Sequence, residues 1–313
     1  MVVTNLYPTR SRPYLSPFVK EQVESLRELY PDMVIDVRLI EGERPRWAYL
    51  KEIILLPIAV RRGKYDVVHA HFGLALISTL FVGKPIVVTF HGSDLLVSPT
   101  KYISRILARR ASKVIVVAEG LRRVLGYGEL VPCGIDTKKF SLPSSYAKVG
   151  YPKKANRLKV LFPSDPKRKI KDYNLYCKTC IELERCGYDV ERVHLVNIDR
   201  QNVHNIFWES DLMLLTSLSE GSPTVIKEAI AAKLPFVSVD VGDVKSWAEK
   251  IDFGIVVVAR NPKILAYAAK DLILRIRNRE ILDNSKCIEN LDLQNVSKRI
   301  RQIYERVVAK PDA

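Results

Sequence analysis

The feature that most constrains the fold of this chain is a regular alternation of short β-branched runs with longer helical patterns. In the first half, runs typical of strands lie at 2–5, 34–39, 66–70, 85–90 and 113–117. Helical patterns lie between them at 17–30, 46–62, 73–82 and 99–110. Strands that alternate with helices favour a parallel sheet with right-handed crossover connections.

The second half repeats this alternation, with strand-like runs at 158–162, 192–197, 212–216, 235–239 and 254–258. The stretch 142–157 is rich in Ser, Pro, Gly and Lys and has no apolar period, which is typical of a linker. We expect an α/β fold of two doubly wound, Rossmann-like domains that face each other across a cleft. The expected boundaries are a first domain at 1–145, a linker at 146–157, a second domain at 158–290, and a C-terminal helix at 291–313 that can pack back on the first domain.

Composition sets the class of protein. The chain has 313 residues, of which 47% are hydrophobic and 27% charged, and this excludes a disordered chain, a collagen-like fibre and a disulfide scaffold. The five cysteines are thinly spread, which favours reduced thiols. The opening MVVTNLYP does not resemble a signal peptide, and the best apolar segment, 72–83, is too short to span a membrane. We expect a cytoplasmic protein.

The net charge of +15 predicts an anionic partner, which can be nucleic acid, a phosphorylated small molecule or an acidic lipid surface. Nucleic acid is disfavoured because the cations are dispersed, no binding motif occurs, and aromatic residues do not alternate with the cations. Lys101, Arg105 and Arg109 form a ridge at helical spacing, and further cations follow the apolar helix that contains Trp47. Both sets are either a solvated face or a docking surface for an anionic membrane leaflet.

In doubly wound sheets, ligands bind beyond the carboxyl ends of the strands. The strand at 85–90 leads directly into His91-Gly92-Ser93-Asp94. His91 can donate a hydrogen bond to a sugar hydroxyl or a phosphate. Asp94 can accept from hydroxyls, or it can simply cap the next helix beside a turn glycine. His69 and His71 share one face of an earlier strand, but no third zinc ligand accompanies them, which favours ordinary polar strand ends.

A second loop follows the strand at 158–162 and carries four cations within 167–171. A basic cluster between the end of a strand and the start of a helix matches a phosphate-binding loop, because cations and helix amides then point at one place. The alternative is a solvated charged loop.

A third loop, 217–221, precedes a helix. Ser222 is predicted to be the N-cap of this helix and Pro223 its first residue, which leaves the amide of Thr224 available to a phosphate oxygen. Glu220 lies before the helix and Glu228 within it. Carboxylates accept hydrogen bonds from vicinal hydroxyl pairs, so this arrangement suits a nucleotide-sugar.

These three loops, in this order, resemble the retaining glycosyltransferases of family 4, which have the two-domain GT-B fold. The resemblance covers most of the chain. It is carried by VTNLYPTRSRPYLSPFVKEQ, DVVHAHFG, VVTFHGSDL and VPCGID in the first half, and by PKRKIKDY and SEGSPTVIKEAIAAKLPFVSVDVG in the second. The last segment corresponds to the E-x7-E region of the family.

The resemblance implies a role for each matching position of the donor side. Arg168 and Lys171 would neutralise the donor diphosphate, together with the amides that follow Ser222, including that of Thr224. Glu220 would contact hydroxyls of the transferred sugar, and Glu228 would bind the ribose.

The remaining matches belong to the first half. His91 would hydrogen-bond the donor sugar, and Asp94 would support its loop. Tyr14 and Ser16 lie in the segment that corresponds to the acceptor-side loop, which here contains no glycine.

The reaction implied by the resemblance is transfer of a hexosyl group from a nucleoside-diphosphate-sugar to an acceptor hydroxyl with retained configuration. The acceptor would be a saccharide or a lipid-linked compound of cell-surface glycan synthesis, with the enzyme peripheral on a membrane. No D-x-D triplet occurs, so neither a metal nor another cofactor is expected. Two alternatives stay open: a nucleotide-sugar epimerase of the same architecture, and a catalytically silent nucleotide-sugar binder.

Overall fold

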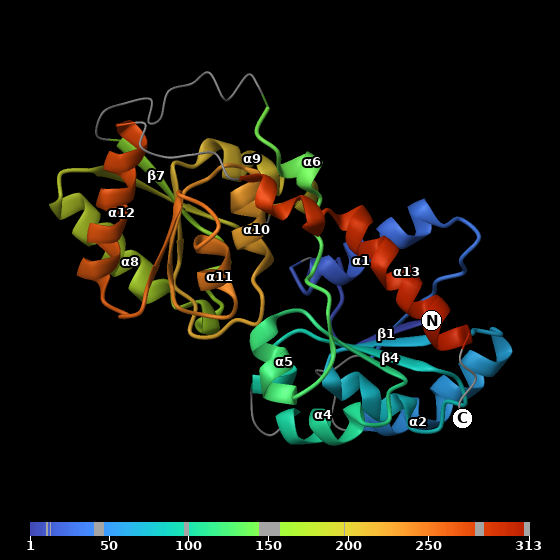
Figure 1. Cartoon of the computed structure of the whole chain (residues 1–313). Helices are drawn as coiled ribbons and strands as arrows, with labels where there is room; N and C mark the ends of the chain where they lie inside the picture. Colours follow the sequence, from blue (N-terminus) through green and yellow to red (C-terminus); the bar gives the residue numbers. More distant parts are fainter. Residues whose placement is uncertain are drawn as a thin grey trace. The chain divides into compact units, whose positions relative to one another are not determined.

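The computed structural model describes residues 1–10, 12, 14–40, 47–96, 100–143, 157–196, 198–278 and 285–309. Its contacts divide the chain into two compact units, of which unit 1 is Met1–Gly134 with Leu293–Ala313 and unit 2 is Ile135–Asp292. Figure 1 shows that each unit is a sheet covered by helices. Both units therefore have the α/β architecture that the alternating pattern predicts.

The sheet of unit 1 has six strands in the order β2-β1-β3-β4-β5-β6, and all neighbours are parallel. The strands are β1 (Val2–Thr4), β2 (Val37–Leu39), β3 (Val68–His71), β4 (Ile86–Phe90), β5 (Lys113–Val116) and β6 (Glu129–Leu130). The central strands β1, β3 and β4 are wholly buried, as expected for a parallel sheet with helices on both faces.

Helices cover both faces of this sheet (Figure 1). One face packs on α1 (Pro17–Leu29) and α13 (Leu293–Ala309), which also contact each other. The other face packs on α2 (Trp47–Arg62), the 3₁₀ helix η1 (Gly73–Thr79) and α4 (Thr100–Ala108). The short helices α3 (Ser93–Leu96) and α5 (Glu119–Leu125) complete the unit. Among the described residues, none of the helices has both the length and the hydropathy to cross a bilayer.

The sheet of unit 2 has five parallel strands in the order β11-β10-β9-β7-β8. They are β7 (Arg157–Phe162), β8 (Asp189–His194), β9 (Leu212–Leu215), β10 (Phe236–Val239) and β11 (Gly254–Val257). The helical segments are α6 (Thr137–Phe140), η2 (Lys169–Lys171), α8 (Tyr173–Arg185), η3 (Arg200–Asn202), α9 (Val203–Glu209), α10 (Thr224–Ala231), α11 (Val244–Ala248), α12 (Pro262–Arg277) and η4 (Ser285–Leu291). One continuous apolar core joins sheet and helices.

Some elements differ from the pattern-based expectation. Within the expected helix at 73–82, Gly73–Thr79 forms a 3₁₀ helix rather than an α-helix. Ser78 and Thr79 donate their hydroxyls to the carbonyls three residues earlier, which suits the tighter winding. The expected linker falls largely on 144–156, outside the described residues. The units divide at Gly134 rather than at 145, because Phe140 packs in the core of unit 2 and accepts a hydrogen bond from Trp208.

The strand order fixes where each unit can bind a ligand. It reverses between β1 and β3 in unit 1, and between β7 and β9 in unit 2. At such a reversal the loops leave the sheet in opposite directions and open a crevice beyond the carboxyl ends of the strands. The loops after β7 and β9 border the reversal in unit 2, and they are the loops that the sequence singles out.

Candidate functional site: a histidine turn and a set of ion-paired loops

The turn after β4 is held by Asp94. The backbone turns sharply at Gly92, whose φ of 126° lies in the region that favours glycine. Both carboxylate oxygens of Asp94 face the backbone N–H of His91, at 3.2 and 3.1 Å, and one also accepts from Gly92 at 2.8 Å. Burial raises the pKa of Asp94 to about 6, although these backbone hydrogen bonds oppose the rise. Asp94 thus fixes the conformation of the turn that presents His91.

Three histidines lie together on β3 and just after β4. His71 Nδ1 lies 3.0 Å from His91 Nε2 and these two rings are stacked, while the rings of His69 and His71 are tilted with centroids 4.2 Å apart. His69 contacts Tyr304 of α13 and Thr89 of β4 through its two ring nitrogens. Burial lowers the pKa of His69, and to a smaller degree the neighbouring histidines do so too. The alternation of β3 places His69 and His71 on one face, as the sequence predicts.

The proton of His71 orients His91. Burial lowers the pKa of His71 to about 3, so the ring is neutral at pH 7 and carries one N–H. Its Nε2 is buried without a hydrogen-bond partner among the described residues. A buried N–H without an acceptor is rarer than an unused acceptor, so we assign the proton to Nδ1, where His71 donates to His91 Nε2. His91 then carries its own proton on Nδ1, which lies 3.7 Å from Cys133 Sγ.

Other residues of unit 1 define the surroundings of His91. Its ring packs against Phe18 and Phe72, with centroids 4.8 and 4.6 Å away.

Within the described ranges, no group of His, Cys, Asp and Glu side chains is arranged to hold a metal ion. Tyr14 is half exposed, and Ser16 is the N-cap of α1 with its backbone in the left-handed region.

In unit 2, Lys171 and Glu220 meet as an ion pair. Lys171 ends η2, in the loop after β7, and Glu220 lies in the loop after β9. Lys171 Nζ lies 2.5 Å from Glu220 Oε1, and both side chains are largely buried. Arg168 precedes η2 and is exposed. The structure therefore brings together two residues that the sequence assigns to the diphosphate and to the sugar.

The start of α10 differs from the prediction. The helix begins at Thr224 with Pro223 as N-cap, one residue later than expected, and Ser222 does not cap it. The hydroxyl of Ser222 instead donates to Asp243 Oδ2 at 2.6 Å and accepts from the ammonium of Lys227 at 2.8 Å. The carboxylate draws the hydroxyl away from the helix, so the backbone amides at this helix start have no serine cap.

Glu228 lies inside α10 and is only 1% exposed. Its Oε1 lies 2.5 Å from Nη2 of Arg200 in η3, while Oε2 is buried without a hydrogen-bond partner in the described part of the chain. A buried carboxylate requires a counter-charge and donors for its lone pairs. Arg200 supplies the charge, and Oε2 is a buried acceptor to which no donor is assigned among the described residues.

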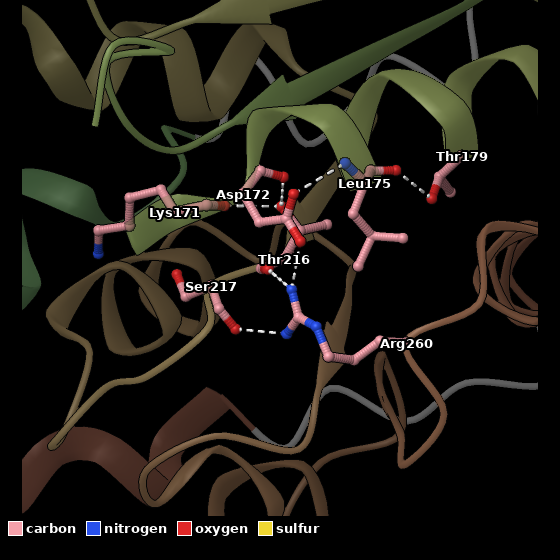
Figure 2. Close-up of polar contacts among 7 residues, drawn as sticks. All are labelled: Lys171, Asp172, Leu175, Thr179, Thr216, Ser217 and Arg260. Atoms are coloured by element: carbon pink, nitrogen blue, oxygen red, sulfur yellow. Dashed lines mark hydrogen bonds and ion pairs between the residues drawn. The ribbon is translucent and has the colours of Figure 1, made fainter. Parts of the chain in front are cut away.

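Sequence reasoning missed two arginines of unit 2: Arg200, which pairs with Glu228, and Arg260, which pairs with Asp172. Arg200 follows β8 in the segment VNIDRQN, and Arg260 precedes α12. Arg260 contacts Asp172 and the end of β9, as Figure 2 shows. Both lie after strands, which is the signal that could have marked them, but neither stands in a motif.

Family models match both halves of the chain. Residues 14–139 match Glycosyltransferase Family 4, and residues 175–275 match Glycosyl transferases group 1. TuaC of Bacillus subtilis, named as a teichuronic acid biosynthesis glycosyltransferase, is 24% identical over an aligned region that covers 78% of this chain and 81% of TuaC.

Solved structures share the fold along nearly the whole chain. Sucrose-phosphate synthase from Thermosynechococcus elongatus has a TM-score of 0.73 at 15% identity and covers 98% of both chains. HepE from Anabaena in complex with UDP has a TM-score of 0.69 at 15% identity and covers 97% of this chain and 99% of its own. With both halves matched in order and the two-domain α/β fold in common, the chain belongs to the group 1 glycosyltransferases of the GT-B fold and is a glycosyltransferase.

Proposed function

We propose that this glycosyltransferase moves a hexosyl group from a nucleoside-diphosphate-sugar to an acceptor hydroxyl and retains the anomeric configuration. The observation that carries the proposal is the set of groups at the strand reversal of unit 2. It combines a cation at Lys171, the amides at the start of α10, and the carboxylates of Glu220 and Glu228. These are the charges and acceptors that a diphosphate flanked by two sugars requires.

Each group has one proposed role on the donor. Lys171 and the exposed Arg168 neutralise the diphosphate, and the amides around Thr224 bind its oxygens. Glu220 accepts from hydroxyls of the transferred sugar, and Oε2 of Glu228 accepts from a ribose hydroxyl. UDP is the ligand of the Anabaena HepE structure, which supports a nucleotide donor for a chain of the same fold.

The chemistry requires no separate base. The bond between the anomeric carbon and the diphosphate oxygen breaks, the acceptor oxygen bonds to that carbon from the same face, and the acceptor proton passes to the leaving diphosphate. Catalysis is then positioning and charge stabilisation. His91 hydrogen-bonds the transferred sugar, while Asp94 holds its turn.

A donor screen tests the proposal. Isothermal titration with UDP, GDP and ADP, each in the presence of EDTA, is expected to show one preferred nucleotide that binds without a metal ion, because Lys171 and Arg168 supply the positive charge. Arg168→Ala should weaken that binding at least tenfold with an unchanged circular dichroism spectrum. Absence of binding to all three nucleotides would contradict the donor class, and binding only with Mg²⁺ would contradict the metal-free mechanism.

We further propose that unit 1 meets its acceptor at an anionic membrane surface. The exposed sides of α2 and α4, and the segment after η1, carry large apolar side chains: Trp47, Leu50, Ile54, Ile58, Phe81, Tyr102, Ile103 and Ile106. Exposed cations alternate with them: Lys51, Arg61, Arg62, Lys64, Lys84, Arg105, Arg109 and Arg110. The sole carboxylate in 47–64, 80–84 and 100–112 is Glu52, which is paired with Arg38.

Such a surface combines apolar anchors with basic residues, which suits the interface of an anionic leaflet. Sedimentation with vesicles that contain phosphatidylglycerol should capture the protein at low salt, and Trp47→Ser with Ile54→Ser should abolish the capture. Capture by neutral vesicles to the same extent, or none by anionic ones, would contradict the proposal. Ile264→Ser on α12 is a matched control, because this exposed apolar side chain belongs to unit 2.

A further inference from the structure

Arg260 joins three segments of unit 2 that are distant in the sequence. It follows β11 and precedes α12, whose N-cap is Asn261. Its Nη1 donates to the carbonyl of Ser217 at 2.8 Å. Its Nη2 donates to the carbonyl of Thr216 at 2.7 Å and to Asp172 Oδ2 at 2.6 Å. Figure 2 shows the planar guanidinium between the end of β9 and the turn that begins α8.

The acceptors of Arg260 belong to the two segments that carry Lys171 and Glu220. Asp172 directly follows Lys171 and has a φ of 48°, a strained conformation for a residue other than glycine. Its other carboxylate oxygen accepts from the backbone N–H of Leu175 and thereby caps α8. The carboxylate of Asp172 thus binds the helix on one side and Arg260 on the other.

Further hydrogen bonds join the same two segments directly. The hydroxyl of Thr216 lies 3.0 Å from the carbonyl oxygens of both Lys171 and Asp172. The backbone N–H of Leu218 donates to the carbonyl of Ile170 at 2.8 Å. Thr216 is 1% exposed. The turn after β7 and the loop after β9 are therefore joined by hydrogen bonds, and Arg260, in the segment after β11, binds to both.

We propose that Arg260 is a positioning residue of the donor site, which sets the spacing of Lys171 and Glu220 and through them the affinity for the donor diphosphate. The inference rests on the proposed role of Lys171. Arg260 acts at a distance from the ligand, because its guanidinium is engaged by Asp172 and two carbonyls. The position requires an arginine, since the planar guanidinium donates to three acceptors at once and a lysine ammonium lacks this geometry.

The first experiment tests, without any ligand, whether Arg260 holds the two segments together. Hydrogen exchange is measured at the amides of Leu218 and Leu175 in the wild-type chain, in Arg260→Met and in Arg260→Lys. Both variants are expected to exchange about tenfold faster at these amides, because the segments separate when the guanidinium is lost. Lys263→Met is the matched control, since it removes an exposed cation from the first turn of the same helix. Unchanged exchange in Arg260→Met would overturn the proposal.

The second experiment is a double-mutant cycle with whichever of UDP, GDP and ADP the wild-type chain binds most tightly. Arg260→Met should weaken binding about tenfold in the wild-type background and have almost no effect in Lys171→Met, because its effect passes through Lys171. Equal losses in both backgrounds would mean that Arg260 acts independently of Lys171, and this would overturn the proposal.

The two experiments separate the inference from the proposed function. If the wild-type chain binds none of the nucleotides, the proposed function is wrong, and the hydrogen exchange still decides whether Arg260 braces the loops. If binding occurs but Arg260→Lys matches the wild-type chain in both measurements, charge alone suffices and the positioning role is wrong.

Discussion

The two units stabilise buried polar groups at their strand ends in opposite ways. In unit 1, His69 and His71 are neutral and hydrogen-bonded, and the carboxylate of Asp94 accepts hydrogen bonds from backbone amides. In unit 2, the groups form pairs of opposite charge: Lys171–Glu220, Arg200–Glu228 and Arg260–Asp172. The stability of a protein with buried neutral groups depends on pH, since burial disfavours their charged form. The stability of a protein with buried ion pairs depends on both partners, since removal of one leaves the other charge uncompensated.

This difference fits a division of labour. In the proposed function a diphosphate requires positive charge, and Lys171 can turn from Glu220 to the ligand while Arg260 stays engaged by Asp172 and two carbonyls. The hydrogen bond proposed between His91 and the transferred sugar requires an imidazole ring of fixed orientation, and the His71–His91 contact provides it. The variants below test whether the two regions respond as differently as their chemistry implies.

The largest effect is expected at Glu228 and Arg200. Arg200→Met should lower the free energy of unfolding by about 3–5 kcal/mol, because it leaves a carboxylate that is 1% exposed without its cation. Glu228→Gln should cost about 1–2 kcal/mol, because Arg200 is 26% exposed and can stay hydrated. Urea unfolding at pH 7 measures both.

The double variant provides the control for this pair. Arg200→Met combined with Glu228→Gln should be more stable than Arg200→Met alone, since no buried charge is left. If Glu228→Gln is the more damaging single change, the carboxylate is not the group that depends on the pair. The asymmetry also bears on activity measurements, because a variant of Glu228 changes stability as well as ribose binding.

Sequence predicted most of the fold and the loops that make up the candidate site, but not the contacts of those loops. Alternating strand and helix patterns located nearly all strands, because β-branched runs in a parallel sheet are buried on both faces. His91, Lys171 and Glu220 were identified because each lies in a loop that follows a strand, and Glu228 because it lies eight residues after Glu220, inside the helix that follows. Arg200 and Arg260 were not, since their partners are set by strand order, which composition does not encode.

The start of α10 shows the same limit. Ser222 and Pro223 match a common helix start, yet the hydroxyl of Ser222 is taken by Asp243, which is distant in the sequence. The 3₁₀ helix η1 is a different case, because its sequence has a helical pattern while hydroxyl contacts within the helix favour the tighter winding. The details that periodicity leaves open are therefore decided by individual side-chain contacts, distant in the sequence at Ser222 and local in η1.

The next effect is a pH dependence of stability that is stronger in unit 1, where burial lowers the pKa of two histidines the most. The pKa of His71 is lowered from 6.5 to about 3 by burial, so the unfolded chain binds more protons and stability falls as pH falls below 6.5. The slope is about 1.4 kcal/mol per pH unit for one such group. His69 acts in the same direction. Asp94, whose pKa is raised from 3.8 to about 6, acts oppositely, because its stabilising effect is present at low pH and is lost as pH rises through 6.

His71→Asn isolates the contribution of His71. Asparagine keeps an amide donor near the position of Nδ1 but does not titrate, so the loss of stability between pH 6 and 4.5 should shrink by about 2 kcal/mol. Urea unfolding at several pH values measures the slope. His204→Asn is a control in unit 2, where the histidine is less buried. An unchanged slope in His71→Asn would mean that His71 is not held neutral by burial.

The smallest effect on stability is expected at Lys171 and Glu220, and it distinguishes the ion pairs of unit 2 from one another. This pair is 12% and 14% exposed, whereas Glu228 is 1% exposed, so each group of the pair can gain water more easily than the carboxylate of Glu228 when its partner is lost. Lys171→Met and Glu220→Gln should each lower the free energy of unfolding by about 1 kcal/mol, which is less than the loss in Arg200→Met. A loss as large as that of Arg200→Met would show that Lys171–Glu220 is a structural pair. In that case a diphosphate could not draw Lys171 from Glu220 at low cost, and the proposed role of Lys171 in neutralising the donor diphosphate would be wrong.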